Sequence, residues 1–128
     1  MKKSGIFNSE IACTVASMGH KDMIAIVDLG FPIPHSVKKI DLVVDKNLPS
    51  LFDVLNVVVK ELEVERFIVA KESSEDFLDK LSEYLPDAKR DIVSHEELKE
   101  ISKGVKAIIR TGEAVPYSNV ILVSGVIF

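Results

Sequence analysis

The stretch that decides the fold is Met23-Ile24-Ala25-Ile26-Val27-Asp28-Leu29-Gly30, a nearly continuous apolar run that closes on an aspartate and a turn. A strand buried on both of its faces has this pattern, because neither face has to meet water. We therefore predict a central strand over residues 23–27, with Asp28 at its carboxyl end. Such strands are typical of α/β domains, in which helices cover both faces of the sheet.

On either side of this strand, the apolar pattern switches repeatedly between helical and strand-like periods. The expected helices lie over residues 9–18, 50–62, 74–85 and 95–101. Further strands are expected over residues 40–44, 66–70, 92–93, 105–109 and 120–123. Ser9, Ser50 and Ser94 can cap the helices that begin there, and Gly19 is placed to end the first helix in a left-handed turn. The pattern predicts a single three-layer domain over residues 1–128, with a central, mostly parallel, Rossmann-like sheet.

Composition excludes several classes of function. The 16 basic and 20 acidic residues form no run long enough to follow a phosphate backbone, which argues against nucleic acid. No apolar run reaches the length of a membrane span, and the N-terminus lacks the core of a secretory signal. The single cysteine, Cys13, has no disulfide partner in the chain and is interpreted as an ordinary buried thiol. We expect a cytoplasmic protein that binds neither nucleic acid nor membrane.

His20 and Asp28 are the first candidates for chemistry. His20 follows the predicted end of the first helix, where the helix dipole favours a protonated imidazole that can donate a proton. Asp28, eight positions later, could hydrogen-bond one ring nitrogen and leave the other to face a ligand. His20 can equally be a solvated loop residue, and Asp28 can equally be ordinary turn chemistry. From these residues alone, both interpretations stay open.

His95 and the stretch Pro116-Tyr117-Ser118-Asn119 are further candidates. His95 lies in the first turn of the predicted fourth helix, where the dipole keeps imidazole neutral and able to accept a proton or bind a hydroxyl. The second stretch offers a phenol, a hydroxyl and an amide, which suit the hydroxyls of a sugar. Both are also compatible with an exposed helix turn and an ordinary loop. Asp28, His95 and the loop Thr111-Gly112-Glu113 are all expected just beyond carboxyl ends of strands, where open α/β sheets bind ligands.

Metal and cofactor motifs are absent. The three histidines, of which His35 is interpreted as a surface residue, share no close spacing, and no C-x-x-C or H-x-x-x-H pair occurs. No glycine-rich phosphate-binding pattern occurs either. We therefore expect an activity without metal or cofactor.

Several motifs in order resemble those of the ribose pyranase / fucose mutarotase family, over nearly the whole chain. They are Gly5-Ile6-Phe7-Asn8-Ser9, Met18-Gly19-His20-Lys21-Asp22, Val27-Asp28-Leu29-Gly30-Phe31-Pro32-Ile33-Pro34, Lys39-Ile40-Asp41, Ile109-Arg110-Thr111-Gly112-Glu113, Pro116-Tyr117-Ser118-Asn119 and Gly125-Val126-Ile127-Phe128. The motifs around residues 32–34 and 116–117, together with His95, resemble the ribose branch more than the fucose branch. Two features depart from the family pattern: residues 71–85 form a shorter segment than in some members, and Ser118 stands where alanine is familiar.

The resemblance implies an isomerase of D-ribose catabolism that interconverts the β-pyranose and β-furanose forms of D-ribose through a ring-opened aldehyde. It implies that His20 is the proton donor and that the sugar is bound by Asp28, His95, Tyr117, Ser118 and Asn119. It also implies a ring-shaped homo-oligomer, a decamer of stacked pentamers, in which residues 117–119 complete the His20 site of a neighbouring subunit. Two alternatives stay open, a mutarotase of L-fucose or another sugar and a non-catalytic sugar-binding module of the same fold.

The C-terminal stretch, residues 120–128, is very apolar for a chain end. A central strand explains residues 120–123. Ile127 and Phe128 are expected to be buried, either in the core of the domain or against another copy of the chain.

Overall fold

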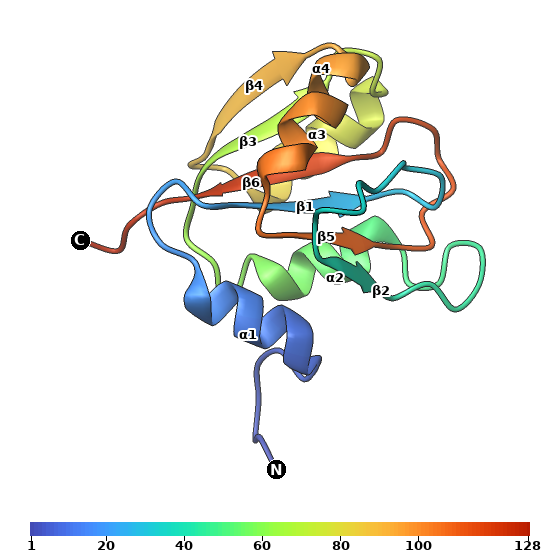
Figure 1. Ribbon diagram of the computed structural model, residues 1–128. Helices are drawn as coiled ribbons and strands as arrows, with labels where there is room; N and C mark the ends of the chain where they lie inside the picture. The colour runs from blue at the N-terminus through green and yellow to red at the C-terminus, as the bar shows by residue number, and fades with distance from the viewer.

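The computed structural model describes all of residues 1–128, and a single six-stranded sheet lies at its centre (Figure 1). The strands are β1 (Met23–Val27), β2 (Lys39–Asp41), β3 (Val64–Ala70), β4 (Lys89–Val93), β5 (Ala107–Arg110) and β6 (Val120–Ser124). The helices are α1 (Ser9–Ser17), α2 (Leu51–Val58), α3 (Glu75–Tyr84) and α4 (His95–Ile101), and a short 3-10 turn, Ser102–Gly104, follows α4. No helix combines the length and the apolar character needed to cross a bilayer.

The sheet is mostly parallel, as predicted, but one inner strand is reversed. The strand order is β2-β5-β1-β6-β3-β4, and β6 runs antiparallel to both of its neighbours, β1 and β3. All other pairings are parallel. Because of this reversal, the loop that leads into β6 lies at the same edge as the carboxyl ends of the other strands (Figure 1). This edge is called the pocket edge below.

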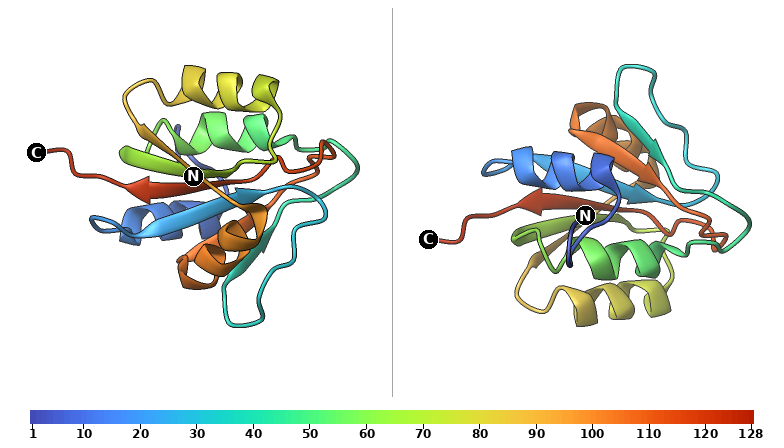
Figure 2. Two further views of the ribbon diagram at one scale, coloured as in Figure 1. Left: turned by 90° about the horizontal axis from the view of Figure 1, so that it is seen from above. Right: turned by 90° about the horizontal axis from the view of Figure 1, so that it is seen from below.

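Alternate residues of each inner strand face two different cores. In β1, Ile24 and Ile26 pack in the larger core with residues of α1, α2 and α3, whereas Ala25 and Val27 pack in the smaller core below α4. These four residues are at most 1% exposed, and full burial of one such aliphatic side chain contributes roughly 1.5–3 kcal/mol. Figure 2 shows α2 and α3 on one side of the sheet and α4 on the other. The predicted three-layer α/β domain is therefore confirmed.

Three of the helices have a serine as the N-cap residue. Ser50, Ser74 and Ser94 each accept a hydrogen bond from the backbone N–H three residues later. The prediction for the first helix is wrong by one residue, because Asn8 caps α1 by accepting from the N–H of Ile11 at 3.0 Å. Asparagine and serine cap helices about equally well, so local sequence does not choose between neighbours.

Three further expectations are corrected by the structure. Gly19 does not form the left-handed turn, because α1 ends in an extended Met18 and the positive φ of 68° falls on Lys21. Cys13 is exposed, since α1 buries only the face that carries Ile11 and Thr14. Ile127 and Phe128, at 89% and 100% exposure, are not buried in the core of the domain, so that of the two expected alternatives only contact with another copy stays a prediction.

Candidate active site

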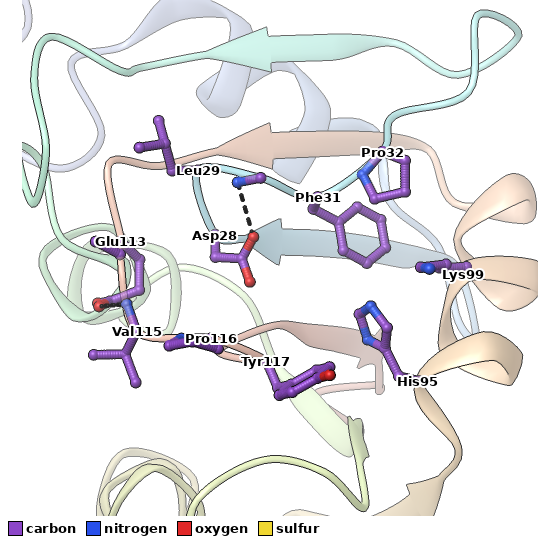
Figure 3. A pocket seen from close by; sticks show the side chains of 12 residues that line it. Asp28, Leu29, Phe31, Pro32, His95, Lys99, Glu113, Val115, Pro116 and Tyr117 are labelled. Atoms are coloured by element: carbon purple, nitrogen blue, oxygen red, sulfur yellow. Dashed lines mark hydrogen bonds between the residues drawn. The ribbon is translucent and has the colours of Figure 1, made fainter.

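A pocket of about 460 Å³ opens at the pocket edge, a size typical of small-molecule sites. Asp28 reaches it from the end of β1, His95 from the start of α4, and Tyr117 from the loop between β5 and β6. Figure 3 shows these three side chains around one hollow. The sequence predicted that Asp28 and His95 lie beyond carboxyl ends of strands, and the structure places them there.

The Asp28 carboxylate is held in place by Asn119. The N–H of Asp28 donates to Asn119 Oδ1 at 2.8 Å, and Asn119 Nδ2 donates to Asp28 Oδ2 at 3.0 Å. The N–H of Gly30 donates to the other carboxylate oxygen at 3.0 Å. This pairing follows from the sheet, because Ile26 of β1 lies opposite Val120 of β6, the residue after Asn119.

Burial sets the acidity of this carboxyl group. Removal from water raises the pKa of Asp28 above its ordinary value, although the hydrogen bonds from Asn119 and Gly30 and the nearby His95 partly oppose the rise. Asp28 is therefore a stronger proton acceptor than an ordinary aspartate and remains a hydrogen-bond acceptor when ionised.

His95 stands between two aromatic rings. Its ring lies edge-on to Phe31 and to Tyr117, with centroid distances of 6.1 Å and 5.0 Å. Its backbone N–H donates to the Glu72 carboxylate at 2.9 Å. The ring atom Nδ1 is buried and has no hydrogen-bond partner, which typically costs about 1–3 kcal/mol. A polar ligand in the pocket could supply the missing partner.

The loop that carries Tyr117 is unusually constrained. Tyr117 has a backbone φ of 60°, a value that residues other than glycine rarely adopt. Its carbonyl accepts from Ser73 Oγ at 2.8 Å, and that bond anchors the loop to the end of β3. Strained backbone of this kind gathers at ligand sites, where the surrounding structure enforces it.

The loop Thr111-Gly112-Glu113 braces the other side of the pocket. Thr111 Oγ1 donates to the carbonyl of Val27 at 2.8 Å, and the Glu113 carboxylate accepts from the N–H of Leu51, the first residue of α2, at 3.3 Å. A Cβ on Gly112 would lie 2.5 Å from the carbonyl oxygen of Asp45, so only glycine fits there. This loop therefore joins β1 to the start of α2.

Lys99 and Glu113 line the pocket, and sequence reasoning did not single out either side chain. A signal for Lys99 existed, since it lies four residues after His95 and thus on the same face of α4. Its ammonium group pairs with Glu96 at 2.9 Å. The only signal for Glu113 was its place in the predicted loop.

Ser118 and Asn119 lie behind the pocket rather than on its surface. Ser118 is 2% exposed and lines a neighbouring hollow of about 340 Å³ beside α3. Asn119 is 1% exposed, so its amide acts on the pocket through Asp28. Of the five residues expected to bind sugar, Asp28, His95 and Tyr117 line the pocket directly.

His20 lies at the opposite edge of the sheet. The five-residue strand β1 separates it from Asp28, a length of roughly 17 Å at about 3.3 Å per residue. Of the two interpretations left open for His20 and Asp28, a hydrogen bond between them is therefore excluded within one chain, because residues that flank a strand lie at its two ends. Instead, His20 Nε2 lies 2.9 Å from Glu65 Oε2.

The turn that carries His20 is firmly attached to the sheet. Lys21 N–H donates to the carbonyl of Ser124 at 2.8 Å, and Ser124 N–H donates to the carbonyl of Asp22 at 2.8 Å. The N–H of Gly19 donates to the Asp22 carboxylate at 2.8 Å. His20 lines a hollow of about 420 Å³ together with the exposed Ile127 and Phe128. This is a positioned imidazole rather than one on a loose loop, whereas His35 is simply exposed.

Comparison with known proteins places this architecture in one family. The model of the RbsD / FucU transport protein family matches residues 1–127. The D-ribose pyranases of Thermosipho africanus and Thermotoga maritima are 58% and 54% identical to this chain, and both alignments cover 100% of either sequence. The structure of Bacillus subtilis RbsD complexed with D-ribose matches with a TM-score of 0.95 at 43% identity, over 100% of both chains. A fucose mutarotase from Streptococcus pneumoniae in complex with L-fucose, 22% identical over 94% of each chain with a TM-score of 0.76, shares the fold. The chain therefore belongs to the RbsD / FucU family.

Proposed function

We propose that this chain is a D-ribose pyranase, an isomerase that interconverts the β-pyranose and β-furanose forms of D-ribose. Relatives named D-ribose pyranase match its whole length, and the related structure with bound D-ribose superposes on all of it. The observation that carries the proposal is the pocket itself, where the fixed Asp28 carboxylate, the unpartnered Nδ1 of His95 and Tyr117 surround one small hollow. Such groups suit the hydroxyls of a small sugar.

For this reaction the protein has to supply only proton transfers. When the pyranose ring opens, the bond between C1 and the ring oxygen breaks, the ring oxygen gains a proton, and the anomeric hydroxyl loses one to give the aldehyde. Attack of the C4 hydroxyl on C1 then closes the furanose ring and reverses both proton transfers. Positioned acids and bases accelerate such steps roughly 10²–10⁴-fold.

In this proposal the pocket residues bind and orient the sugar. Asp28 accepts hydrogen bonds from hydroxyls, and its raised pKa also suits it to take up a proton from one. His95 and Tyr117 supply further donors and acceptors, while Asn119 keeps Asp28 oriented. Ser118, whose side chain faces away from the pocket, contributes through the backbone of its loop.

His20 is the proton donor, and it comes from a neighbouring copy of the chain. This part of the proposal is supported by the position of His20, which is exposed at the edge opposite the pocket on a turn that is hydrogen-bonded to the sheet. The exposed Ile127 and Phe128 beside it offer apolar surface for a contact. Contact between the His20 edge of one copy and the pocket edge of the next is head-to-tail, and such contacts can close into rings. We propose a homodecamer of stacked pentamers, as the family resemblance implies.

Saturation-transfer NMR with D-ribose tests the proposed activity. We expect exchange between the pyranose and furanose signals to be faster with the protein than without it. Exchange restricted to the α and β anomers of a sugar such as L-fucose would identify a mutarotase instead. Binding of ribose without any exchange would identify a sugar-binding module. Sedimentation analysis of the same sample tests the decamer.

A cytoplasmic location belongs to the same proposal. It is supported by the single cysteine, Cys13, which is exposed and has no disulfide partner in the chain.

A further inference from the structure

The contact between His20 and Glu65 connects the exposed imidazole to a strand far away in sequence. The two side chains are 47% and 37% exposed, and their atoms Nε2 and Oε2 lie 2.9 Å apart. An ionised carboxylate can only accept a hydrogen bond, so the proton in this contact is carried by Nε2. The other ring nitrogen, Nδ1, is then left for a different partner.

A β-bulge places Glu65 against His20. Val64 and Arg66 of β3 lie opposite two consecutive residues of β6, Ser124 and Val123, so Glu65 is the extra residue between them. Bulges of this kind redirect a side chain at the margin of a sheet. Gly125 follows in close contact, because a Cβ on it would lie 3.1 Å from Cβ of Glu65 and 3.3 Å from its backbone nitrogen.

Both partners are attached to the same end of β6. The turn of His20 bonds to Ser124 on one side, and the N–H of Gly125 donates to the carbonyl of Glu63 at 2.9 Å on the other. The geometry of the pair is thus determined by backbone contacts and exists without any ligand. A partly exposed pair of this kind contributes little to the stability of the fold. Its contribution to folding therefore does not by itself explain why the two side chains are placed together.

We propose that Glu65 is a positioning residue for His20, whose carboxylate accepts the Nε2–H and so directs Nδ1 toward the sugar. The proposal rests on the proposed function, in which His20 is the proton donor. As the bond between C1 and the ring oxygen breaks, the imidazolium passes its Nδ1 proton to that oxygen and becomes the neutral Nε2–H tautomer. The anomeric hydroxyl gives its proton to Asp28 in the same step. When the C4 hydroxyl attacks C1, its proton returns to Nδ1 and Asp28 returns a proton to the carbonyl oxygen. Glu65 neither touches the sugar nor changes its own protonation, as is usual for a carboxylate that orients a catalytic histidine.

Exchange kinetics of Glu65 variants test the role. Glu65→Ala removes the acceptor, and we expect kcat to fall on the order of 10-fold or more while KM for ribose stays unchanged. Glu65→Gln retains an oxygen that can accept the Nε2–H, so it should recover part of the loss. Glu83→Ala, which removes the same charge from an exposed position on α3 outside the hollow that contains His20, serves as the matched control and should behave as wild type.

A double variant separates positioning from a merely structural role. In the His20→Ala background, Glu65→Ala should cause no further loss, since it acts only through His20. Additive losses in the double variant would contradict the proposal. So would wild-type kcat in a Glu65→Ala protein that assembles like the wild type.

The tautomer of His20 gives a readout that needs no variant at Glu65. The chain has three histidines, so ¹⁵N-histidine spectra of wild type and His20→Ala assign the His20 signals. We expect the neutral ring to carry its proton on Nε2, and finding it on Nδ1 would refute the proposal even if the Glu65 variants failed to assemble. If the wild-type protein exchanged no sugar ring forms, the proposed function would fail, while the tautomer would still report on the Glu65 contact.

Discussion

The two ends of β1 differ in how they hold a functional side chain. At the pocket edge, Asp28 is fixed by the buried Asn119, and His95 carries a buried ring nitrogen without a partner. At the other edge, the His20 ring is about half exposed and contacts a carboxylate that is itself partly exposed. The pocket edge thus has buried polar groups that suit a ligand, whereas at the other edge the His20 imidazole points out from the surface.

This difference indicates that the two edges of the sheet contribute different groups to the proposed site. In our proposal the pocket residues bind and orient the sugar, and the pocket lacks the imidazole at the end of the first helix that was expected to donate a proton. The His20 edge has that imidazole but has neither Asp28 nor Tyr117 beside it. We infer that contact between two copies brings the two halves together.

The largest effect on the rate of ring exchange is expected from removal of the His20 imidazole. His20→Ala or His20→Gln should lower the rate of ring exchange by roughly 10²–10⁴-fold, because the proposed proton donor is removed. Saturation-transfer NMR measures the rate. The circular dichroism spectrum should remain that of the wild type, since the His20 side chain is about half exposed and contributes little to the core. Wild-type exchange by a folded His20→Ala protein would exclude His20 as the donor.

Mixing two inactive variants tests whether the two edges act together. His20→Ala and Asp28→Ala proteins are combined under conditions that exchange subunits, and some contacts then pair an intact His20 with an intact Asp28. We expect part of the activity to return after mixing. Each variant mixed with itself is the control. If mixed oligomers form and stay inactive, the site lies within one subunit.

A smaller effect is expected from pH, and it is specific to the pocket edge. Because the pKa of Asp28 is raised by burial, acidification protonates it at a higher pH than an ordinary aspartate, and ribose affinity should fall there. The effect on folding has the opposite sign, since the stability associated with protonated Asp28 is present at low pH and is lost as the pH rises through the raised pKa.

Titration calorimetry with ribose across this pH range measures the effect on affinity. Asp28→Asn should bind more weakly and lose the pH dependence. A dependence that persists in Asp28→Asn would assign it to another group.

No effect is expected from metal removal. The proposed mechanism uses only proton transfers between side chains and sugar, and the sequence has no spacing typical of a metal site. Exchange rates measured before and after exhaustive chelation should agree. A loss that a divalent ion restores would contradict the mechanism.

Much of the fold could be predicted where the signal is local. The bounds of β1 match the apolar run at residues 23–27, and α2 begins directly after Ser50, the predicted helix cap. The start of α1 was missed by one residue because Asn8 and Ser9 are both good caps. Local rules thus locate elements well and their ends less well.

The candidate site was predictable only in part, for the same reason. Asp28 and His95 were expected at the carboxyl edge because each follows an apolar strand, and both line the pocket. The sequence pattern did not indicate that β6 is antiparallel, and this reversal is what places Asn119 against Asp28. A hydrogen bond between His20 and Asp28 does not form within one chain, because the two residues are close in sequence but lie at opposite ends of β1.

The sequence by itself determined which residue types stand at the strand ends and helix starts, since apolar periodicity and capping depend on neighbours along the chain. Only the tertiary structure decided which of these ends meet. Asp28 contacts a residue 91 positions away, and His20 contacts one 45 positions away through a bulge that no local pattern marks. Strand direction and register are set by such distant contacts, and they bring Asn119 to Asp28 and Glu65 to His20.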